Sequence, residues 1–282
     1  MRRLLLIAMC CVARTASADP CTAEQPEAGV PVRIATGPAD FGMLPEACAA
    51  TAVSLSGRMG ILIAEEDFYG SLLVAGALRA RIELPGGSWL STSLPGPEYR
   101  FVANATLEAD SVDLSASTLG YHVPIVVGRL QLAPYFRFML PSETVFQHAR
   151  RLGLEHGVSM VAPAGKYLEM IAGYGLPLYL TVQPGGTEAA YLPTVSFDVA
   201  ARPVRWFVGA LGISVRVFPE EEESFESLDP RAALRFYPTH GLLIEATGAV
   251  PVLGRDRTDG LVSLAIGWIA EAGVLSPAAA TP

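Results

Sequence analysis

Apolar and polar residues alternate one for one in twelve stretches of this chain. In residues 78–84, Leu-Arg-Ala-Arg-Ile-Glu-Leu, the apolar residues share one parity and the three charged residues occupy the other. Because side chains along a β-strand point alternately to opposite faces, each stretch predicts a strand with one apolar and one polar face. Repeated over many strands, this pattern is typical of transmembrane β-barrels, which have lipid outside and a polar interior.

We therefore predict an all-β fold: an antiparallel up-and-down transmembrane β-barrel of about twelve strands, with a short N-terminal periplasmic extension. The predicted strands are residues 55–64, 71–84, 88–107, 110–125, 129–140, 150–161, 167–182, 190–201, 204–217, 229–238, 241–253 and 260–271. The third is interrupted by Leu-Pro-Gly-Pro at 94–97. Because proline cannot donate to the ladder of hydrogen bonds, we expect a bulge or bend there.

The connectors from the fifth strand onward alternate between long and short. The long set is 141–148, 183–189, 218–228 and 254–259, and the short set is 162–166, 202–203 and 237–240. Short periplasmic turns and longer outside loops are the rule in these barrels. With an even strand count, this arrangement places both ends of the barrel on the periplasmic side.

The N-terminal residues resemble a secretory signal peptide. Arg2 and Arg3 precede an apolar run at 4–13, and Ala-Ser-Ala at 16–18 fits a cleavage site. Residues 19–54 show no sustained alternation, so we predict a periplasmic extension that lies below the barrel or partly plugs it. The barrel then spans 55–271, followed by a flexible tail at 272–282. Elsewhere the sequence has no uninterrupted apolar stretch of about twenty residues, the length that a transmembrane helix needs.

The composition agrees with a barrel that turns its apolar surface outward. Hydrophobic residues make up 51% of the chain and the mean hydropathy is +0.36, although no helical span accounts for them. Removing the three arginines of residues 1–18 leaves 17 basic side chains against 28 acidic ones, a net charge of about −11. Such a charge argues against nucleic acid as a partner.

Two cysteines, Cys21 and Cys48, remain after the predicted cleavage. In an oxidising compartment the default for such a pair is a disulfide bond, which we predict. Lipidation of Cys10 or Cys21 is an alternative, although Met9 and the Asp19-Pro20 pair are not the small residues that lipoprotein processing accepts. Metal binding by this pair is a further alternative, and we expect no metal and no cofactor.

A secreted soluble β-sandwich or small barrel is the main competing fold. Its apolar faces would pack inward and abundant charge would cover the outside. Here the second face is mostly serine, threonine, glycine and alanine with scattered charges, as in 194–199, where Thr194, Ser196 and Asp198 alternate with valine and phenylalanine. Such a face suits a lumen better than bulk water.

The polar parity assigns six basic and six acidic residues to the predicted lumen. They are Arg79, Arg81, Glu83, Arg100, Asp113, Arg137, Glu155, Glu169, Asp198, Arg216, Arg235 and Glu245. A balanced set favours ion pairs across a narrow interior, because an unpaired charge away from water is costly. Two interpretations remain open: a mixed-charge constriction that selects small solutes, and structural filling of a closed barrel. Twelve strands enclose more space than eight, which side chains can fill.

Aromatic residues near the predicted strand ends are compatible with girdles at the membrane interfaces. They are Phe68, Tyr69, Trp89, Tyr121, Tyr167, Tyr191, Trp206 and Phe218.

The C-terminal hairpin, Ala-Thr-Gly-Ala-Val-Pro-Val at 246–252 followed by a polar loop and residues 260–269, resembles bacterial outer-membrane barrels assigned to transport in phenol and other aromatic degradation pathways. Leu140-Pro141 and the Leu-Pro-Leu at 176–178 add to this resemblance, which covers 55–271 in architecture. It implies a channel of the outer membrane. One departure is that the last strand continues through Glu271 to a tail rich in alanine and proline, whereas such barrels usually end on an aromatic residue.

Enzyme motifs are absent from the sequence. G-x-S-x-G, H-E-x-x-H, P-loop and C-x-x-C patterns do not occur, so we expect no enzyme activity. Outer-membrane lipid hydrolases need only a serine and a histidine near the bilayer rim, which keeps His148 and His156 as weak candidates. His122 and His240 lie toward the periplasmic side. We interpret all four as interfacial or hydrogen-bonding residues.

An acidic loop follows the ninth predicted strand. It comprises Glu220 to Glu223, Glu226 and Asp229, and is either simply solvated or a site for divalent cations that bridge lipopolysaccharide.

We therefore predict an exported barrel of the Gram-negative outer membrane that passes small molecules passively. The alternative is a closed structural or surface-interaction barrel without transport. The expected partners are outer-membrane lipid, lipopolysaccharide, the assembly machinery and small solutes.

Overall fold

The structure is a computed structural model that describes residues 51–64, 69–103, 108–114, 117–144, 149–164, 167–183, 186–204, 206–217, 227–239, 242–250, 252 and 260–271. The predicted signal peptide at 1–18, almost all of the extension at 19–54 and the tail at 272–282 lie outside these residues. So do Cys21 and Cys48, whose disulfide stays a prediction. No helix among the described residues is long and apolar enough to cross a membrane.

The described chain is made of β-strands joined by turns. The strands are β1 (Ala52–Ala64), β2 (Tyr69–Glu83), β3 (Trp89–Ala103), β4 (Glu108–Leu114), β5 (Thr118–His122), β6 (Ile125–Val127), β7 (Leu130–Thr144), β8 (Ala149–Pro163), β9 (Leu168–Gln183), β10 (Gly186–Tyr191), β11 (Thr194–Val204), β12 (Phe207–Arg216), β13 (Ser227–Thr239), β14 (Leu242–Ala249) and β15 (Gly260–Glu271).

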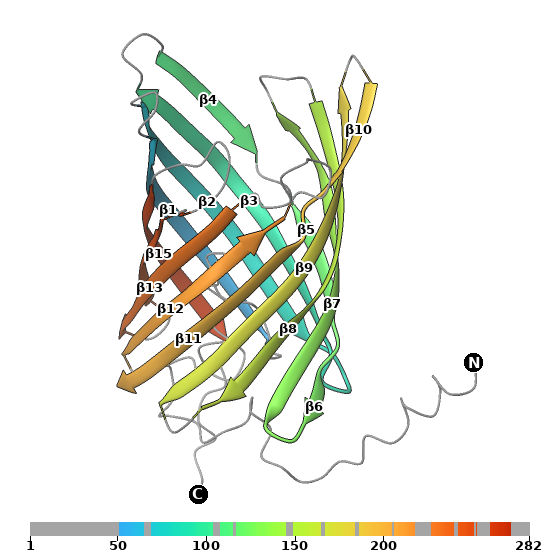
Figure 1. The fold of residues 1–282 in the computed structure, drawn as a ribbon, viewed down its shortest axis with the longest axis vertical. Helices are drawn as coiled ribbons and strands as arrows, with labels where there is room; N and C mark the ends of the chain where they lie inside the picture. The colour runs from blue at the N-terminus through green and yellow to red at the C-terminus, as the bar shows by residue number, and fades with distance from the viewer. Residues whose placement is uncertain are drawn as a thin grey trace, which may run out of the picture.

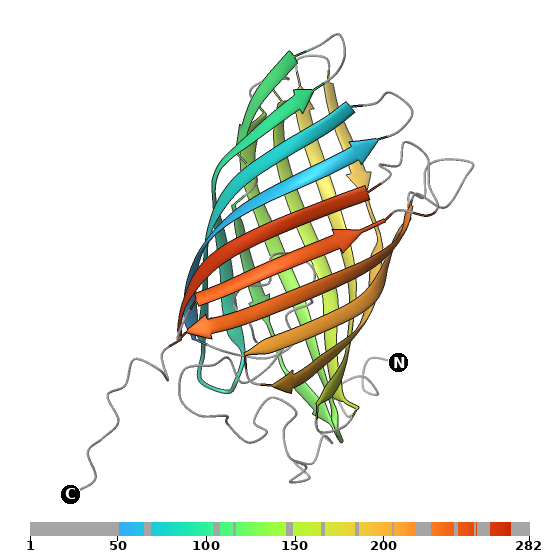
Figure 2. The same ribbon diagram turned by 90° about the vertical axis from the view of Figure 1, so that its left-hand side faces the viewer.

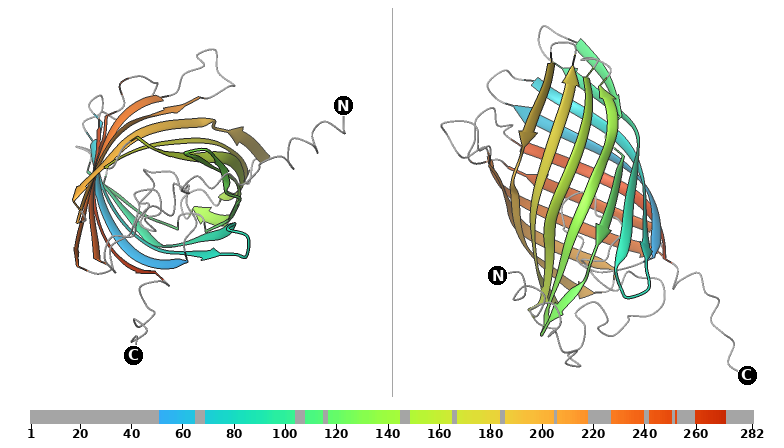
Figure 3. Two further views of the ribbon diagram at one scale, coloured as in Figure 1. Left: turned by 90° about the horizontal axis from the view of Figure 1, so that it is seen from below. Right: turned by 90° about the vertical axis from the view of Figure 1, so that its right-hand side faces the viewer.

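These strands close into a single antiparallel barrel of twelve strands, which confirms the predicted fold class (Figures 1 and 3). Around the ring the order is β1, β2, β3, β5, β7, β8, β9, β11, β12, β13, β14 and β15. The last strand pairs with the first from Ala52 opposite Glu271 to Ile63 opposite Gly260, so the sheet has no open edge (Figure 2). β4 extends the β5 position along β3, and β10 extends the β11 position along β9.

We name the two ends of the barrel by the strand ends that lie there. The terminal end is where β1 begins and β15 ends, and it includes the β6–β7 hairpin at the bottom of Figure 1. The loop end is the opposite one, where β1 ends and β15 begins.

The alternation of residue types is an alternation of faces, as predicted. On β1, Leu55 is 64% exposed on the outer face, whereas Ser54 and Ser56 on either side of it are buried. On β11, exposed Val195, Phe197 and Val199 alternate with buried Ser196, Asp198 and Ala200. Apolar side chains therefore cover the outside of the ring and the polar parity faces the interior.

Proline accompanies each register shift among the described strand pairs. The β2–β3 register shifts between Ala75 and Ala77, opposite the segment that contains Pro95 and Pro97, which confirms the bulge expected at 94–97. The other shifts contain Pro141 in β7, Pro203 in β11 and Pro238 in β13. A proline lacks the backbone N–H that a regular ladder needs, so a bulge at that point costs no hydrogen bond.

The predicted connectors differ most at 183–189 and 202–203. β9 continues to Gln183 and β10 starts at Gly186, so most of the expected long connector is strand. Gly186, where β10 begins, has a φ of +148°, a backbone conformation that favours glycine. At 202–203 the strand β11 continues through Val204, and β12 begins at Phe207. The long and short alternation survives only at the last two loop-end connectors, 217–226 and 250–259.

Candidate functional site: the barrel lumen

The structure places the predicted lumen charges at several depths. Arg81, Asp198, Arg235 and Glu245 are buried, Arg79, Arg137, Glu155 and Glu169 are partly exposed, and Arg216 is exposed, all on the same polar parity. Glu83 shares that parity but is exposed, because it is the last residue of β2. Arg100 pairs in register with Ser111, and Asp113 with Glu98, while the side chains of Arg100 and Asp113 lie outside the described part.

Two ion pairs join adjacent strands along the wall. Arg137 Nη1 lies 3.2 Å from Glu155 Oε2, and these residues are direct register partners on β7 and β8. Arg235 Nε donates to Glu245 Oε2 between register partners on β13 and β14, where both side chains are fully buried. Pairing along the wall neutralises these charges without placing a side chain across the barrel axis.

A third pair depends on a glycine between its partners. Arg231 Nε and Nη2 donate to Asp198 Oδ1 and Oδ2 at 2.9 and 2.5 Å, although their strands β13 and β11 are separated by β12. Gly212 is the register partner of both residues and has no side chain to keep them apart. The result is a bidentate contact, the geometry in which arginine binds a carboxylate best.

Two charged residues that form ion pairs on the inner wall were not among the predicted lumen charges. Arg231 and Asp229 share the parity of Arg235 along β13, so strand alternation was the signal that could have found them. Asp229 had been assigned to the acidic loop. That assignment is wrong, because Asp229 is buried in β13 and accepts a hydrogen bond from Arg216 Nη2 at 2.9 Å. Glu220 to Glu223 and Glu226 lie outside the described residues.

An aromatic ladder lines the wall at the terminal end. The rings of Trp89 and His122 are stacked with centroids 4.8 Å apart, and those of His122 and Tyr135 with centroids 5.3 Å apart. These three residues are consecutive register partners on β3, β5 and β7, so the sheet itself brings their rings together. Trp89 had been predicted for an interfacial girdle. That assignment is wrong, because its side chain has no exposed surface and faces the interior.

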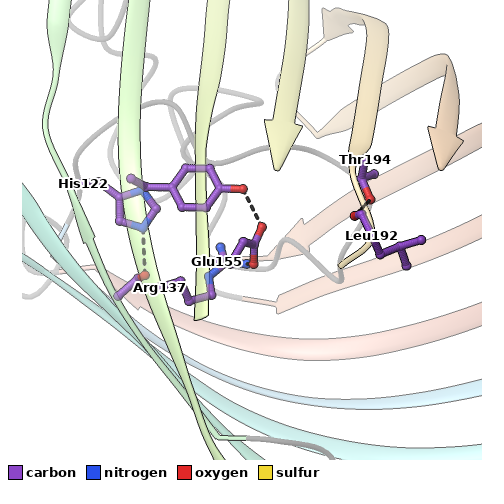
Figure 4. Close-up of polar contacts among 7 residues, drawn as sticks. His122, Arg137, Glu155, Leu192 and Thr194 are labelled. Atoms are coloured by element: carbon purple, nitrogen blue, oxygen red, sulfur yellow. Dashed lines mark hydrogen bonds and ion pairs between the residues drawn. The ribbon is translucent and has the colours of Figure 1, made fainter. Parts of the chain in front are cut away.

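The ladder continues into the charged wall (Figure 4). Tyr135 donates its hydroxyl proton to Glu155 Oε1 at 2.6 Å, while Arg137 holds the other carboxylate oxygen and lies 5.2 Å from the centre of the Tyr135 ring. Gly157 and Gly175 follow Tyr135 in the same register row. A Cβ at Gly157 would lie 2.6 Å from the Tyr135 hydroxyl oxygen, so the tyrosine occupies the space that a side chain there would need.

His122 also forms a hydrogen bond with Ser91, between Oγ and Nε2 at 2.9 Å. A serine and histidine at this distance resemble a nucleophile and its base. Here His122 is fully buried between two rings, and Ser91 is partly exposed. Of the other histidines, His156 is exposed on the outer parity, and His148 and His240 lie outside the described residues. No group of three or more metal-ligating side chains occurs in the described part of the chain.

Other predicted girdle residues do lie on the outer surface. Tyr121, Tyr167, Tyr191 and Trp206 are exposed. Trp206 belongs to a cluster at the terminal end with Phe207 and Phe236, whose ring centroids lie 6.2 and 6.5 Å from that of Trp206. The side chains of Phe68, Tyr69 and Phe218 lie outside the described part.

Replacing Gly212 with alanine is expected to destabilise the barrel by about 1–3 kcal/mol, the usual cost of overpacking. The new Cβ would lie 2.0 Å from Asp198 Oδ1 and 2.5 Å from the Phe197 carbonyl oxygen, so Asp198 must leave Arg231. Gly57→Ala is the matched control, because nothing lies within 4 Å of its Cβ position. Urea unfolding of both variants in the same detergent measures the difference, and an equal loss at the two positions would show that Gly212 is not needed for the pair.

Comparison with known proteins identifies the fold. No protein-family model and no curated protein sequence matches the chain. Among solved structures, an outer membrane channel from Pseudomonas putida F1 superimposes with a TM-score of 0.61, at 11% identity, over 83% of this chain and 99% of that one. The translocator domain of the autotransporter NalP from Neisseria meningitidis gives 0.48 at 10% identity, over 78% and 88%. The CymD monoaromatic hydrocarbon channel gives 0.45 at 6% identity, over 79% and 89%.

At such identities the likeness concerns the fold. The chain has the fold of a bacterial outer-membrane β-barrel, as its resemblance at the sequence level implied.

Proposed function

We propose that this protein is an outer-membrane channel of a Gram-negative bacterium that passes small molecules passively through its lumen. The observation that carries the proposal is the closed ring whose outer face is apolar and whose inner charges are paired along the wall. An apolar exterior needs lipid around it, and a closed ring is one of the two structures that satisfy every backbone group within lipid. Charges that pair along the wall line the lumen without bridging it.

The proposed orientation places the terminal end in the periplasm, because the two long connectors 217–226 and 250–259 then face outward. The proposed partners are outer-membrane lipid and lipopolysaccharide around the barrel, the machinery that assembles such barrels, and small solutes inside it.

A closed structural or surface-interaction barrel is the second candidate. The observation that favours it is the complete burial of Trp89, His122, Arg235 and Glu245 on the inner wall, because a wide open pore would leave such side chains wet. Conductance across a planar bilayer by the refolded full-length protein separates the two candidates. Discrete conductance steps support the channel, and a folded protein that never conducts contradicts it.

Replacing both Arg79 and Arg81 with glutamine is expected to shift a conducting barrel toward cations. The change removes two positive charges from one strand of the inner wall, and a permeating ion crosses the field of that wall. The shift should be larger at low salt, because screening is weaker there. Reversal potentials in a salt gradient measure it. Arg129→Gln is the control, because Arg129 is exposed in the β6–β7 turn. An ion preference that ignores the double substitution would mean that ions take another path.

A further inference from the structure

His156 places a titratable side chain on the outer surface of the barrel, near the middle of the apolar band. It is exposed on the outer parity of β8, and the other outer residues of that strand are apolar. They are Leu152, Leu154, Val158, Met160 and Ala162. With a rise of about 3.4 Å per residue and a tilt of about 40°, they span about 26 Å along the barrel axis, which matches the apolar band of outer-membrane barrels. His156 is then about 3 Å from the middle of that band.

A second polar group lies beside His156 on the same face. Tyr174 of β9 is 37% exposed on the outer parity, two residues from Leu176, the register partner of His156. β8 and β9 run side by side along the barrel (Figure 1). Within the part of the chain that the structure describes, no hydrogen bond, ion pair or ring contact involves His156 or Tyr174. Two groups that can each donate and accept therefore face the region that hydrocarbon would occupy.

Lipid alone cannot satisfy these two groups. Hydrocarbon offers no hydrogen bond, and a polar group without one is costly there. Lysine and arginine near a membrane surface escape this cost by extending along the protein to water, but histidine is shorter and His156 lies about 10 Å from Leu152, the last apolar residue on the loop-end side of β8. Ionisable residues within a membrane usually pair with other protein groups. We therefore expect a protein partner at this depth.

We propose that a second copy of this chain packs against the face formed by β8 and β9, with His156 of each copy hydrogen-bonded to Tyr174 of the other. A neutral imidazole has one N–H donor and one acceptor nitrogen, and a tyrosine hydroxyl donates and accepts, so the two groups are complementary. A two-fold axis along the membrane normal repeats the contact and makes two equal hydrogen bonds. The polar groups of both copies are then satisfied without any other molecule.

Aromatic residues supply the packing around this polar pair. Phe136, the register partner of His156 on β7, is 39% exposed, and Phe138 is 49% exposed. Their rings meet edge to face with centroids 5.0 Å apart. Because lipid tails are as apolar as the side chains, association within a membrane depends on packing and on hydrogen bonds between the partners. The face that carries His156 and Tyr174 offers both.

This inference shares with the proposed function the placement of the barrel in lipid, but it does not need an open lumen. Conductance tests the channel, and the association of two copies tests the dimer. A protein that dimerises without conducting would contradict only the channel, and a monomer that conducts would contradict only the dimer.

The first experiment measures association of the full-length protein by sedimentation equilibrium in density-matched detergent micelles. The wild-type protein is expected to dimerise. Tyr174→Phe removes only a hydroxyl group and should lower the association constant by about tenfold, because each dimer loses two hydrogen bonds. His156→Leu should cause a similar loss, and the double variant should lose no more than either single variant, because the two groups bond to each other. Tyr121→Phe is the matched control: this tyrosine is 45% exposed on the outer face of β5, and its change should leave association unaltered.

Three outcomes of this experiment would overturn the proposal. They are a wild-type protein that stays monomeric at every ratio of protein to detergent, a dimer that ignores both substitutions, and losses that simply add in the double variant. His156→Gln should retain most of the association, because its amide also donates and accepts.

A second experiment identifies the partner in cell envelopes. Leu176→p-benzoylphenylalanine leaves His156 and Tyr174 in place, and irradiation is expected to link it to peptides from β8 and β9 of a second copy, as identified by mass spectrometry. Leu264→p-benzoylphenylalanine is the matched control, because Leu264 is 43% exposed on the outer face of β15, six strands away around the ring, and should link to lipid. Links from position 176 only to lipid or to a different protein would overturn the proposal.

Discussion

Replacing Glu245 with alanine is expected to lower the free energy of unfolding by about 3–5 kcal/mol, the usual cost of breaking a buried ion pair from one side. Glu245 has no exposed surface and accepts a hydrogen bond from Arg235 Nε. Its removal leaves the guanidinium charge of Arg235, itself 1% exposed, buried without this carboxylate. Urea unfolding followed by tryptophan fluorescence measures the loss.

Two control variants separate the effect of the buried, unneutralised Arg235 charge from other effects of the substitution. Asp229→Ala breaks a similar pair between neighbouring strands, but its partner Arg216 is 47% exposed and stays hydrated, so we expect a loss of about 1 kcal/mol or less. The double variant Arg235→Met with Glu245→Leu removes both charges and should recover most of the stability. A loss at Glu245 no greater than that at Asp229 would contradict the burial argument.

Strand alternation was enough to predict the barrel. Polar and apolar residues alternate in Ser54, Leu55 and Ser56 and again from Val195 to Ala200, and the apolar residues are the ones on the outer face. This alternation can be read from the local sequence alone. The bulge near Pro95 and Pro97 could also be predicted from the local sequence, because a proline lacks the backbone N–H that the ladder of hydrogen bonds needs. Strand ends at the loop end were predicted less well, since β10 (Gly186–Tyr191) pairs with β9 inside a segment that was predicted to be a connector.

Partner choice within the lumen could not be read from the sequence, because it depends on register between strands. Arg231 reaches Asp198 only because Gly212 stands between them in one row. The stack of Trp89, His122 and Tyr135 likewise follows from three strands arriving in one register, although their sequence separation is large. The alternation along a strand predicts which residues lie on the inner face. Which of these residues are neighbours depends on the shear of the closed barrel.

Arginine in place of Leu211 is expected to destabilise the protein in lipid by about 2–4 kcal/mol, because Leu211 lies at the middle of β12 on the outer face and is 69% exposed there. The guanidinium would face hydrocarbon at that depth. Thr194→Arg is the matched control: this residue is on the inner parity, partly exposed beside Arg216, and should lose much less.

Urea unfolding from vesicles measures both variants, and Leu211→Ala separates loss of the leucine from gain of the charge. A membrane origin of the effect has a further signature. The loss of unfolding free energy caused by Leu211→Arg should be smaller in short-chain detergent, where the charge can reach water at the micelle surface. The loss caused by Thr194→Arg should be the same in vesicles and in detergent. Equal tolerance of arginine at both positions in vesicles would mean that the outer face does not lie in lipid, and the membrane barrel would have to be replaced by a soluble one.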